Sequence, residues 1–502
     1  MARSRVVVAV LLVGLLAGSL SLAQTRTLVI AQSADASTMD PHNHLERVTG
    51  IIHSNIFDTL LFRNARGEII PWLATAWRQI DDVTTEFDLR RGVTFHNGEP
   101  FNAQAVKFTV DRVLDPNYAS PQLGQVGQVD HVDIVDDYTV RFVTKAPWPL
   151  LLSRLTTNFR IVAPGYYSQN PANVVALNPV GAGPYRLGEW VRDDHVTLVA
   201  NENYWGGRPP YDQVIFRPVP EPATRLAELL GGGAQIVTDP TPDGLTVIRN
   251  TPGVHAEIAP SNRMIFLYLK TDIGGPLANK QVRQALNYAV DVNGIIEFVL
   301  EGLGTRIATV VTELDFGHDP TIMPYPYDPD RARTLLADAG YPNGFTFSLV
   351  TTGQNEFLND RQVGEAIVGN LADVGVTVDL HIREFQSYVQ QILGHSIPED
   401  AWMVDFGDPI FDADANIGFL FDPAGCCTYF TTPRLTELVQ LGRTTVDPAR
   451  RLEIYSETQR ILIDEAPMIF LYHQNNTYGV SDSVVWQGRS DELIWTYTAR
   501  PQ

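Results

Sequence analysis

The sequence predicts an α/β protein of two lobes joined by a hinge, on three observations. The chain has 502 residues, which is more than one hydrophobic core usually organises. From about residue 264 onward, predicted helices and strands alternate, as is typical of an α/β lobe. The apolar stretch MIFLY occurs twice, at 264–268 and 468–472, at the two borders of this block. Two similar buried strands in these positions are what a hinge crossed twice would need.

The first 23 residues have the pattern of a secretory signal peptide. Two arginines precede an apolar run that begins at Val6, and small residues lead to a cleavage site after Ala23. The run is shorter than the ~20 residues of a membrane-spanning helix. No cysteine stands near the cleavage site to carry a lipid. We therefore expect an exported protein that is free in the periplasm.

The charge balance argues against some partners. Lys and Arg number 37 against 58 Asp and Glu, a formal net charge of −21. Binding to phosphate groups depends on clustered Lys and Arg, so we expect neither nucleic acid nor an anionic membrane surface as partner.

The cysteines are few and adjacent. Cys426 and Cys427 stand side by side, so a framework of several disulfides is impossible. A strained bridge between the two neighbours and a pair of reduced thiols both remain open. Two thiolates are too few for a structural zinc site.

Mixed helices and strands are expected before residue 264. The segment 46–62 has apolar residues at helical spacing and predicts a helix. Asn102 is a plausible cap for a helix that runs to residue 114. Strands are expected at 25–32, 69–90, 132–144, 196–220 and 234–240, with a Pro- and Gly-rich junction at 178–190 and a helix at 221–232.

The second block predicts regular alternation. Helices are expected at 280–300, 328–340, 361–375 and 448–466, and strands at 264–271, 345–352, 376–382 and 467–480. Asp328 and Pro329 begin the second of these helices and Gly340 ends it, which is favourable capping chemistry.

Enzyme signatures fail where they can be tested. GHSIP at 394–398 lacks the second glycine of a nucleophile elbow. GAGPYR at 181–186 and GGGAQ at 231–235 lack residues that nucleotide-binding loops need. DADANIG at 412–418 has Ile417 where a calcium loop requires glycine. We expect no cofactor and no metal. Paired carboxylates of a glycoside hydrolase, which can come from distant parts of a chain, remain the enzymatic alternative.

Five stretches in order carry a family resemblance, at 57–77, 89–113, 177–237, 282–291 and 327–345. The segment LNPVGAGPYRLGEW…GGGAQIV and its companions resemble the extracytoplasmic solute-binding proteins of the dipeptide, oligopeptide and nickel class (family 5), which feed ABC importers. The resemblance implies a two-lobed periplasmic binding protein fold. It assigns 24–265, completed by 473–502, to a first lobe with an extra subdomain, and 266–472 to the second. Gln235, where the family usually has an acid, and the cysteine pair depart from it.

The resemblance also suggests ligand contacts in the acidic and apolar stretch AWMVDFGDPIFDAD, residues 401–414. Buried carboxylates need partners. In peptide-binding members a carboxylate here receives the α-ammonium group of the ligand, a role that falls to Asp408 by position, with Asp405 second. An Asp-Pro turn that caps a local amide is the alternative for Asp408. Trp402 and Phe406 either wall the pocket or belong to the core. Asp412 and Asp414 are expected to be solvated or capping.

Further candidates are single residues. Arg361 is placed roughly where dipeptide binders hold the ligand carboxylate, and Arg263 stands just before the first crossing strand. His42 and Asn43 lie where cleft loops of the first lobe are expected to begin, and His473 stands beside the second crossing strand. An exposed helix face for Arg361 and a structural role for His473 are the alternatives.

These features predict a periplasmic receptor that closes on a small solute and does no chemistry. A peptide-like ligand, the membrane permease of an ABC importer as partner and a monomeric state are expected. A sugar, an opine, a glutathione-like compound or a metal chelate are alternative ligands. A carbohydrate-active hydrolase using Asp405 or Asp408 with a distant acid, and a peptide-holding chaperone, are alternative functions.

Overall fold

The computed structural model describes residues 25–353, 357–425 and 427–502. The predicted signal peptide, 1–23, lies outside these residues. Cys426 lies outside them too, so the predicted alternatives for the cysteine pair fall outside the described residues. Its neighbour Cys427 is buried.

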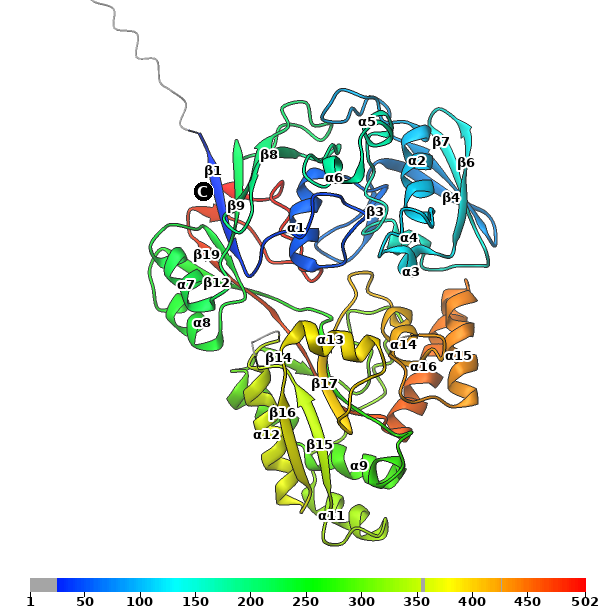
Figure 1. Cartoon of the computed structure of the whole chain (residues 1–502), viewed down its shortest axis with the longest axis vertical. Coiled ribbons are helices and arrows are strands. Elements are labelled where there is room, and N and C mark those ends of the chain that lie inside the picture. Colours follow the sequence, from blue (N-terminus) through cyan, green and yellow to red (C-terminus); the bar gives the residue numbers. More distant parts are fainter. Residues whose placement is uncertain (1–24, 354–356, 426) are drawn as a thin grey trace, which may run out of the picture.

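The first lobe is built on a mixed sheet, which has seven strands within the described residues (Figure 1). Its order is β12 (Val254–Ala259), β19 (Asn476–Ser481), β11 (Ile236–Thr238), β1 (Thr27–Gln32), β10 (Gln213–Pro218), β9 (His195–Ala200) and β8 (Tyr185–Val191). β1 pairs in parallel with β10 and β11. The predicted strands at 25–32, 196–220 and 234–240 are thereby confirmed.

An extra subdomain of the first lobe holds an antiparallel sheet with the order β4 (Ala74–Asp81), β5 (Thr84–Leu89), β7 (Thr139–Thr144) and β6 (Val129–Asp136). The helix α2 (Ala103–Leu114) packs on it, and Asn102 caps this helix as predicted by accepting from the backbone amides of Gln104 and Ala105.

Shorter elements complete the first lobe. They are α1 (Arg47–Ile56), β2 (Leu61–Arg63), β3 (Ile69–Pro71), α3 (Leu123–Val126), α4 (Leu151–Arg154), α5 (Pro164–Gln169), α6 (Ala172–Val175), α7 (Pro222–Leu230), α8 (Pro242–Arg249), β20 (Val484–Val485) and β21 (Arg500–Pro501). The helix predicted at 46–62 is too long. It ends at Ile56 because Phe57 is extended, and the apolar residues that continued the pattern belong to the buried start of β2.

The second lobe has its own sheet, with the order β14 (Gly304–Arg306), β18 (Met468–Gln474), β13 (Met264–Leu269), β17 (Ala401–Phe406), β15 (Thr346–Thr351) and β16 (Thr377–Ile382). The two MIFLY stretches form β13 and β18, which are antiparallel neighbours and buried along their whole length. The predicted buried strand at 264–271 is confirmed. The one predicted at 467–480 is in fact two strands, since it is divided at Asn475 into β18 and β19 of different sheets.

Helices surround this second sheet. They are η1 (Pro276–Ala278), α9 (Lys280–Ala289), α10 (Val292–Gly294), η2 (Ile295–Val299), α11 (Pro329–Asp338), α12 (Asp360–Asp373), α13 (Phe385–Leu393), α14 (Ala413–Phe421), α15 (Pro433–Thr444) and α16 (Pro448–Glu465). Asp328 caps α11 as expected. The predicted helix 280–300 is in fact interrupted, since Val290 is extended and Asp291 caps a new turn.

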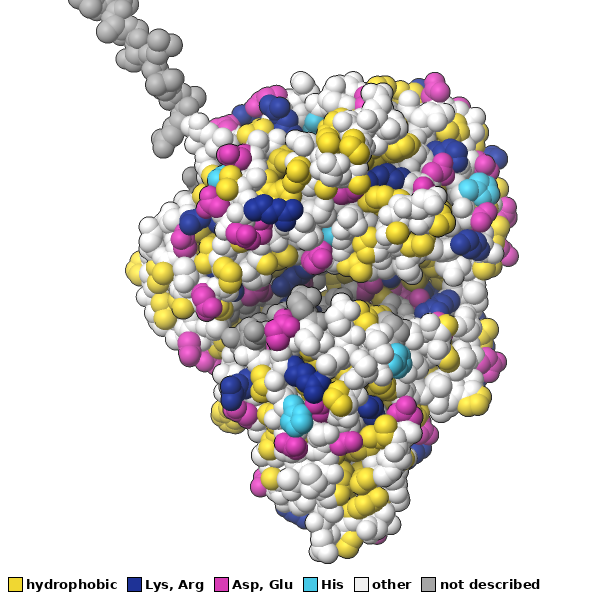
Figure 2. Space-filling model, viewed as in Figure 1, with side chains coloured by type: hydrophobic (Ala, Val, Ile, Leu, Met, Phe, Trp, Pro, Cys, Tyr) yellow, Lys and Arg dark blue, Asp and Glu magenta, His cyan; other side chains and the backbone are white. Residues whose placement is uncertain are grey.

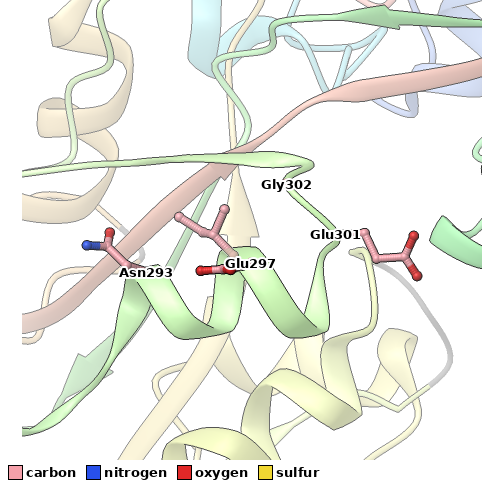
Figure 3. A pocket seen from close by; sticks show the side chains of 5 residues that line it. Asn293, Glu297, Glu301 and Gly302 are labelled. Carbon is pink, nitrogen blue, oxygen red and sulfur yellow. The ribbon is translucent and has the colours of Figure 1, made fainter.

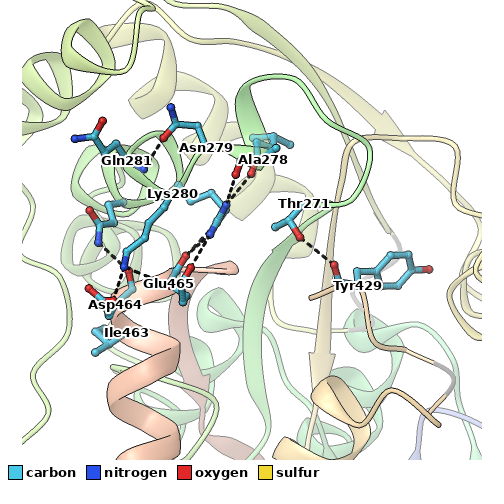
Figure 4. A network of polar contacts seen from close by, with 12 residues as sticks. Thr271, Ala278, Asn279, Lys280, Gln281, Tyr429, Ile463, Asp464 and Glu465 are labelled. Carbon is cyan, nitrogen blue, oxygen red and sulfur yellow. Dashed lines mark hydrogen bonds and ion pairs between the residues drawn. The ribbon is translucent and has the colours of Figure 1, made fainter. Parts of the chain in front are cut away.

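Charged groups fix α9 against the end of α16 (Figure 4). Lys280 forms ion pairs with Asp464 and, at 3.3 Å, with Glu465. Arg283 donates to the backbone oxygen of Glu465 at 2.8 Å. These contacts hold the helix that leads back into β18, the second hinge strand.

The chain changes sheets twice. It leaves β12 after Ala259 and enters β13 at Met264, and it returns from β18 after Gln474 into β19 at Asn476. The predicted lobe limits, 24–265 with 473–502 and 266–472, lie close to these crossings and stay a prediction.

Candidate functional site

The two lobes face each other across a hollow that Figure 2 shows on one face of the molecule. On the first lobe, β1 and β11 are parallel neighbours, so their carboxyl ends at Gln32 and Thr238 lie together. On the second lobe, β15 and β17 are parallel and end on the same edge. Ligands of open α/β sheets bind outside such carboxyl ends. The space between the carboxyl ends of the two sheets is therefore the candidate site.

Asp408 is held by an arginine of the opposite lobe. Arg154, the last residue of α4, places Nη2 3.0 Å from Oδ2 and Nη1 3.3 Å from Oδ1 of Asp408. Both residues are buried. Oδ1 also accepts from the backbone amide of Ile410 at 3.1 Å, which is the turn contact that the sequence offers as an alternative. The carboxylate therefore has an internal cation and a local amide as partners.

The loop that carries Asp408 inserts into the first lobe. Ile410 packs in the apolar core of the extra subdomain, and its backbone oxygen accepts from Nη2 of Arg63 at 2.8 Å. The guanidinium of Arg63 also lies 5.2 Å from the centre of the Phe411 ring. The loop 407–412 thus joins the lobes, and it also contacts the outward hinge crossing, where Asn262 donates to the backbone oxygen of Asp408 at 2.8 Å.

Asp405 and Arg263 form an ion pair at the edge of the second sheet. The strand register pairs Ile265 with Asp405, which places Arg263, just before β13, beside this carboxylate. Two of the predicted site residues are therefore brought together next to the first hinge crossing.

The other acids of 401–414 have arginine partners as well. Asp412 contacts Arg451 through two bonds of 2.7 Å and caps α14. Asp414 lies 3.4 Å from Arg443, and burial raises the pKa of Asp414 to about 6. Of the two expected roles, solvated or capping, capping is confirmed for Asp412, whereas neither acid is solvated, because both are buried. The apolar stretch tolerates its four acids because an arginine faces each of them.

The two aromatic candidates differ. Trp402 is buried and stacks on Tyr268 with ring centres 5.1 Å apart, so it is a core residue. Phe406 is half-buried and stacks on Phe419 at 4.3 Å. It stands at the end of β17, at the edge that faces the first lobe.

The contacts of Arg361 and His473 fit the alternatives to a ligand role, which are an exposed helix face for Arg361 and a structural role for His473. Arg361 is exposed on α12, where it pairs with Glu365 at 3.0 Å. His473 is buried in β18, and its Nε2 lies 3.0 Å from Glu313.

His42 and Asn43 lie in the first lobe. The ring of His42 is buried between Arg112, 2.7 Å from Nδ1, and the backbone oxygen of Arg160, 2.8 Å from Nε2. Burial and the charge of Arg112 lower the pKa of His42 to about 3, so this side chain is neutral at ordinary pH. Asn43 is exposed.

A cavity of the first lobe brings together residues that the sequence analysis missed. It is small, with a volume of about 10 Å³, which is about the space that one water molecule needs, and it is lined by Gln32, Arg47, Val48, Ile51, Thr238, Asp239, Tyr478 and Glu492. Arg47 forms an ion pair with Glu492, and its Nη2 lies 3.9 Å from Asp239. The signal that could have found the pocket is positional, since Gln32 and Thr238 end two buried parallel strands.

This pocket lies beside the hinge. Ser261, in the longer crossing, donates to Oε1 of Glu492 at 3.4 Å. β19, which continues from the shorter crossing, carries Tyr478. The pocket is therefore placed where the two lobes meet.

The second lobe has a wider hollow near Gly302 (Figure 3). It has a volume of about 520 Å³ and is lined by Asn293, Ile296, Glu297, Glu301 and Gly302. The side chains of Asn293 and Glu301 point in opposite directions in this view. Polar groups therefore do not converge there as they do in the first-lobe pocket.

Within 25–353, 357–425 and 427–502, no three or more His, Cys, Asp or Glu side chains are grouped so that they could hold a metal ion. None of the helices in these ranges is both long and apolar enough to cross a membrane.

Two lobes, two chain crossings and a site between them define a solute receptor of the binding-protein type. The profile of the bacterial extracellular solute-binding proteins, family 5, matches residues 68–423. The chain belongs to this family, and the resemblance drawn from the sequence is confirmed.

Individual relatives and solved structures agree with this family assignment. The chain is 27% identical over 488 residues to the dipeptide-binding protein of Escherichia coli, with 90% of each chain covered. It is 28% identical to heme-binding protein A of Haemophilus influenzae, covering 82% of this chain and 80% of that one. The structure of the periplasmic binding protein DppA of Helicobacter pylori with the peptide STSA is 26% identical, with a TM-score of 0.81, and covers 95% of this chain and 98% of that one.

Proposed function

We propose that this protein is a monomer that captures a short peptide between its lobes in the periplasm. It delivers the peptide, unaltered, to the permease of an ABC importer. The observation that carries the proposal is the likeness to the Helicobacter pylori protein, an ABC transporter-associated periplasmic binding protein in complex with a peptide, over 95% of this chain. The similarity to the Escherichia coli dipeptide-binding protein supports it.

The arrangement of the lobes supports capture by closure. Each lobe has its own sheet, and the chain passes between them only at 260–263 and at Asn475 within the described residues. A solute that contacts both lobes binds the closed form more tightly than the open one and so shifts the population toward it. We propose that the lobes move as 25–259 with 476–502 and as 264–474.

We assign the cleft edge of the second lobe to the solute site, with Asp405, Arg263 and Phe406 as its candidates. The contacts of Trp402, His42 and Arg361 give no support for a ligand role. The hydrolase alternative needs a free acid, whereas Asp405 and Asp408 are both paired with arginines.

The test is to purify the protein from its native periplasm, denature it and identify the released small molecules by mass spectrometry. A short peptide is expected. A heme, a glutathione-like compound, an opine or a metal chelate would support the receptor function but refute the proposal that the solute is a peptide. Conversion of a bound sugar polymer into shorter products would refute the receptor, and a preference for unfolded proteins would indicate a chaperone.

A further inference from the structure

The loop 407–412 of the second lobe places an apolar side chain inside the first lobe. Ile410 has 1% of its surface exposed and packs in the same apolar cluster as Leu151 of α4. Ala415 of α14 belongs to this cluster too, and Figure 1 shows α4 directly above α14. Separation of the lobes would transfer Ile410 from this cluster to water, which is unfavourable.

The first lobe has a prepared partner for the loop. Nη1 of Arg63 donates to the backbone oxygen of Gly67 at 2.7 Å, a contact within the first lobe. The backbone oxygen of Arg63 accepts from Nη2 of Arg489 at 2.6 Å. These contacts fix Arg63, whose Nη2 donates to the backbone oxygen of Ile410 at 2.8 Å. Little side-chain entropy is therefore lost at Arg63 when the loop docks.

The docked loop needs no solute to satisfy its polar groups. The two carboxylate oxygens of Asp408 lie 3.0 and 3.3 Å from the guanidinium of Arg154, and Oδ1 also accepts from the backbone amide of Ile410. The backbone oxygen of Asp408 accepts from Asn262 at 2.8 Å. A buried polar group is costly when it lacks a partner, and these groups have partners within the chain. The contacts that join the lobes here are therefore complete without a bound molecule.

We propose that the docked loop 407–412 keeps the lobes closed in the absence of solute, so that the receptor rests in its closed form. The inference goes beyond the proposed function, because it concerns the empty receptor and not the identity of the solute. A solute then enters only through the minor open population, when the loop undocks, and its apparent affinity is reduced by that fraction. Binding stabilises a closed form that already predominates.

Small-angle X-ray scattering of the empty protein tests the inference. Bound solute is removed by unfolding in guanidinium chloride, dialysis and refolding, and mass spectrometry of a denatured sample establishes that none remains. The empty wild-type protein should give the radius of gyration calculated from the closed structure. A casein digest, added as a source of peptides, should then change the scattering curve little.

Variants locate the cause of closure in the loop. Ile410→Ala removes a side chain that is buried only in the closed form, and a loss of this kind lowers the ratio of closed to open molecules at least about thirtyfold. Combined with Arg154→Met it should lower the ratio about a thousandfold or more, so the radius of gyration of the empty protein should rise. Ile410→Leu, which keeps the apolar volume, should give the wild-type curve. Ile273→Ala, at a position that is 49% exposed, is the matched control, and unchanged circular dichroism would establish that the variants are folded.

Two results would overturn the inference. If the empty wild-type protein has a larger radius of gyration than the closed structure, the lobes rest open. If the double variant gives the wild-type curve, the loop is not what keeps the lobes closed. Failure of the peptide proposal is a separate outcome: a wild-type protein that retains no peptide from the digest, by mass spectrometry, refutes that proposal, whereas a closed empty protein still supports the inference.

Discussion

The ion pair between Arg154 and Asp408 should contribute to the closing of the lobes. We consider Arg154→Met, which removes the charge and keeps much of the side-chain volume. Removing one partner of a buried ion pair costs about 3–5 kcal/mol. Opening of the lobes lets water reach Asp408, so this cost falls on the closed form alone. At about 1.4 kcal/mol for each tenfold change, the ratio of closed to open molecules should fall at least about a hundredfold.

Small-angle X-ray scattering measures this change. A larger radius of gyration is expected for Arg154→Met than for the wild-type protein. The double variant with Asp408→Asn should return toward the wild-type value, because it leaves no unpaired buried charge. Arg361→Met is the matched control, since the ion pair of Arg361 lies on the surface of a single helix. Superimposable scattering curves for Arg154→Met and wild type would refute the reasoning.

Three further predictions concern stability. Arg451→Met leaves a buried aspartate unpaired and should lower the free energy of unfolding in urea by about 3–5 kcal/mol, whereas the exposed Arg450→Met should change it little; equal effects would contradict this. Burial raises the pKa of Asp58 to about 6, above its ordinary 3.8, so its contribution to stability is full below pH 3.8 and is lost as the pH rises through 6. Asp58→Asn should therefore flatten the dependence of Tm on pH between 4 and 6, and parallel curves would count against it. Gly344→Ala should lower Tm strongly, because φ is +75° and the added Cβ would lie 1.7 Å from a backbone oxygen. Gly369→Ala, in open space on α12, should raise it slightly, and the reverse order would refute the steric argument.

Local patterns predicted the elements that depend on neighbours in sequence. β13 and β18 were found because a fully apolar run bounded by polar residues suits a strand buried on both faces. The cap of α11 was found because Asp328 acts on an amide three residues away. The predicted helix at 46–62 was too long because the apolar spacing continues into the buried start of β2, and spacing alone does not separate the two.

The candidate site could be predicted only in part. The stretch 401–414 indicated that its acids needed partners, and the partners exist. Their identity depends on the tertiary fold, since Arg154 is 254 residues away from Asp408. The pocket around Asp239 was missed for the same reason, because its members come from five separate parts of the chain.

The two crossings between the lobes are unequal, and this gives the hinge a direction. The return crossing is the single residue Asn475, fixed by the pairing of β18 with β13 before it and of β19 with β12 after it. Such a short link can act only as a pivot. The outward crossing, 260–263, is longer, and it contacts each lobe once: Ser261 donates to Glu492 of the first lobe, and Asn262 donates to the backbone oxygen of Asp408 of the second at 2.8 Å. Rotation about Asn475 therefore pulls on the outward crossing, which connects the pocket of the first lobe mechanically to the loop 407–412 of the second.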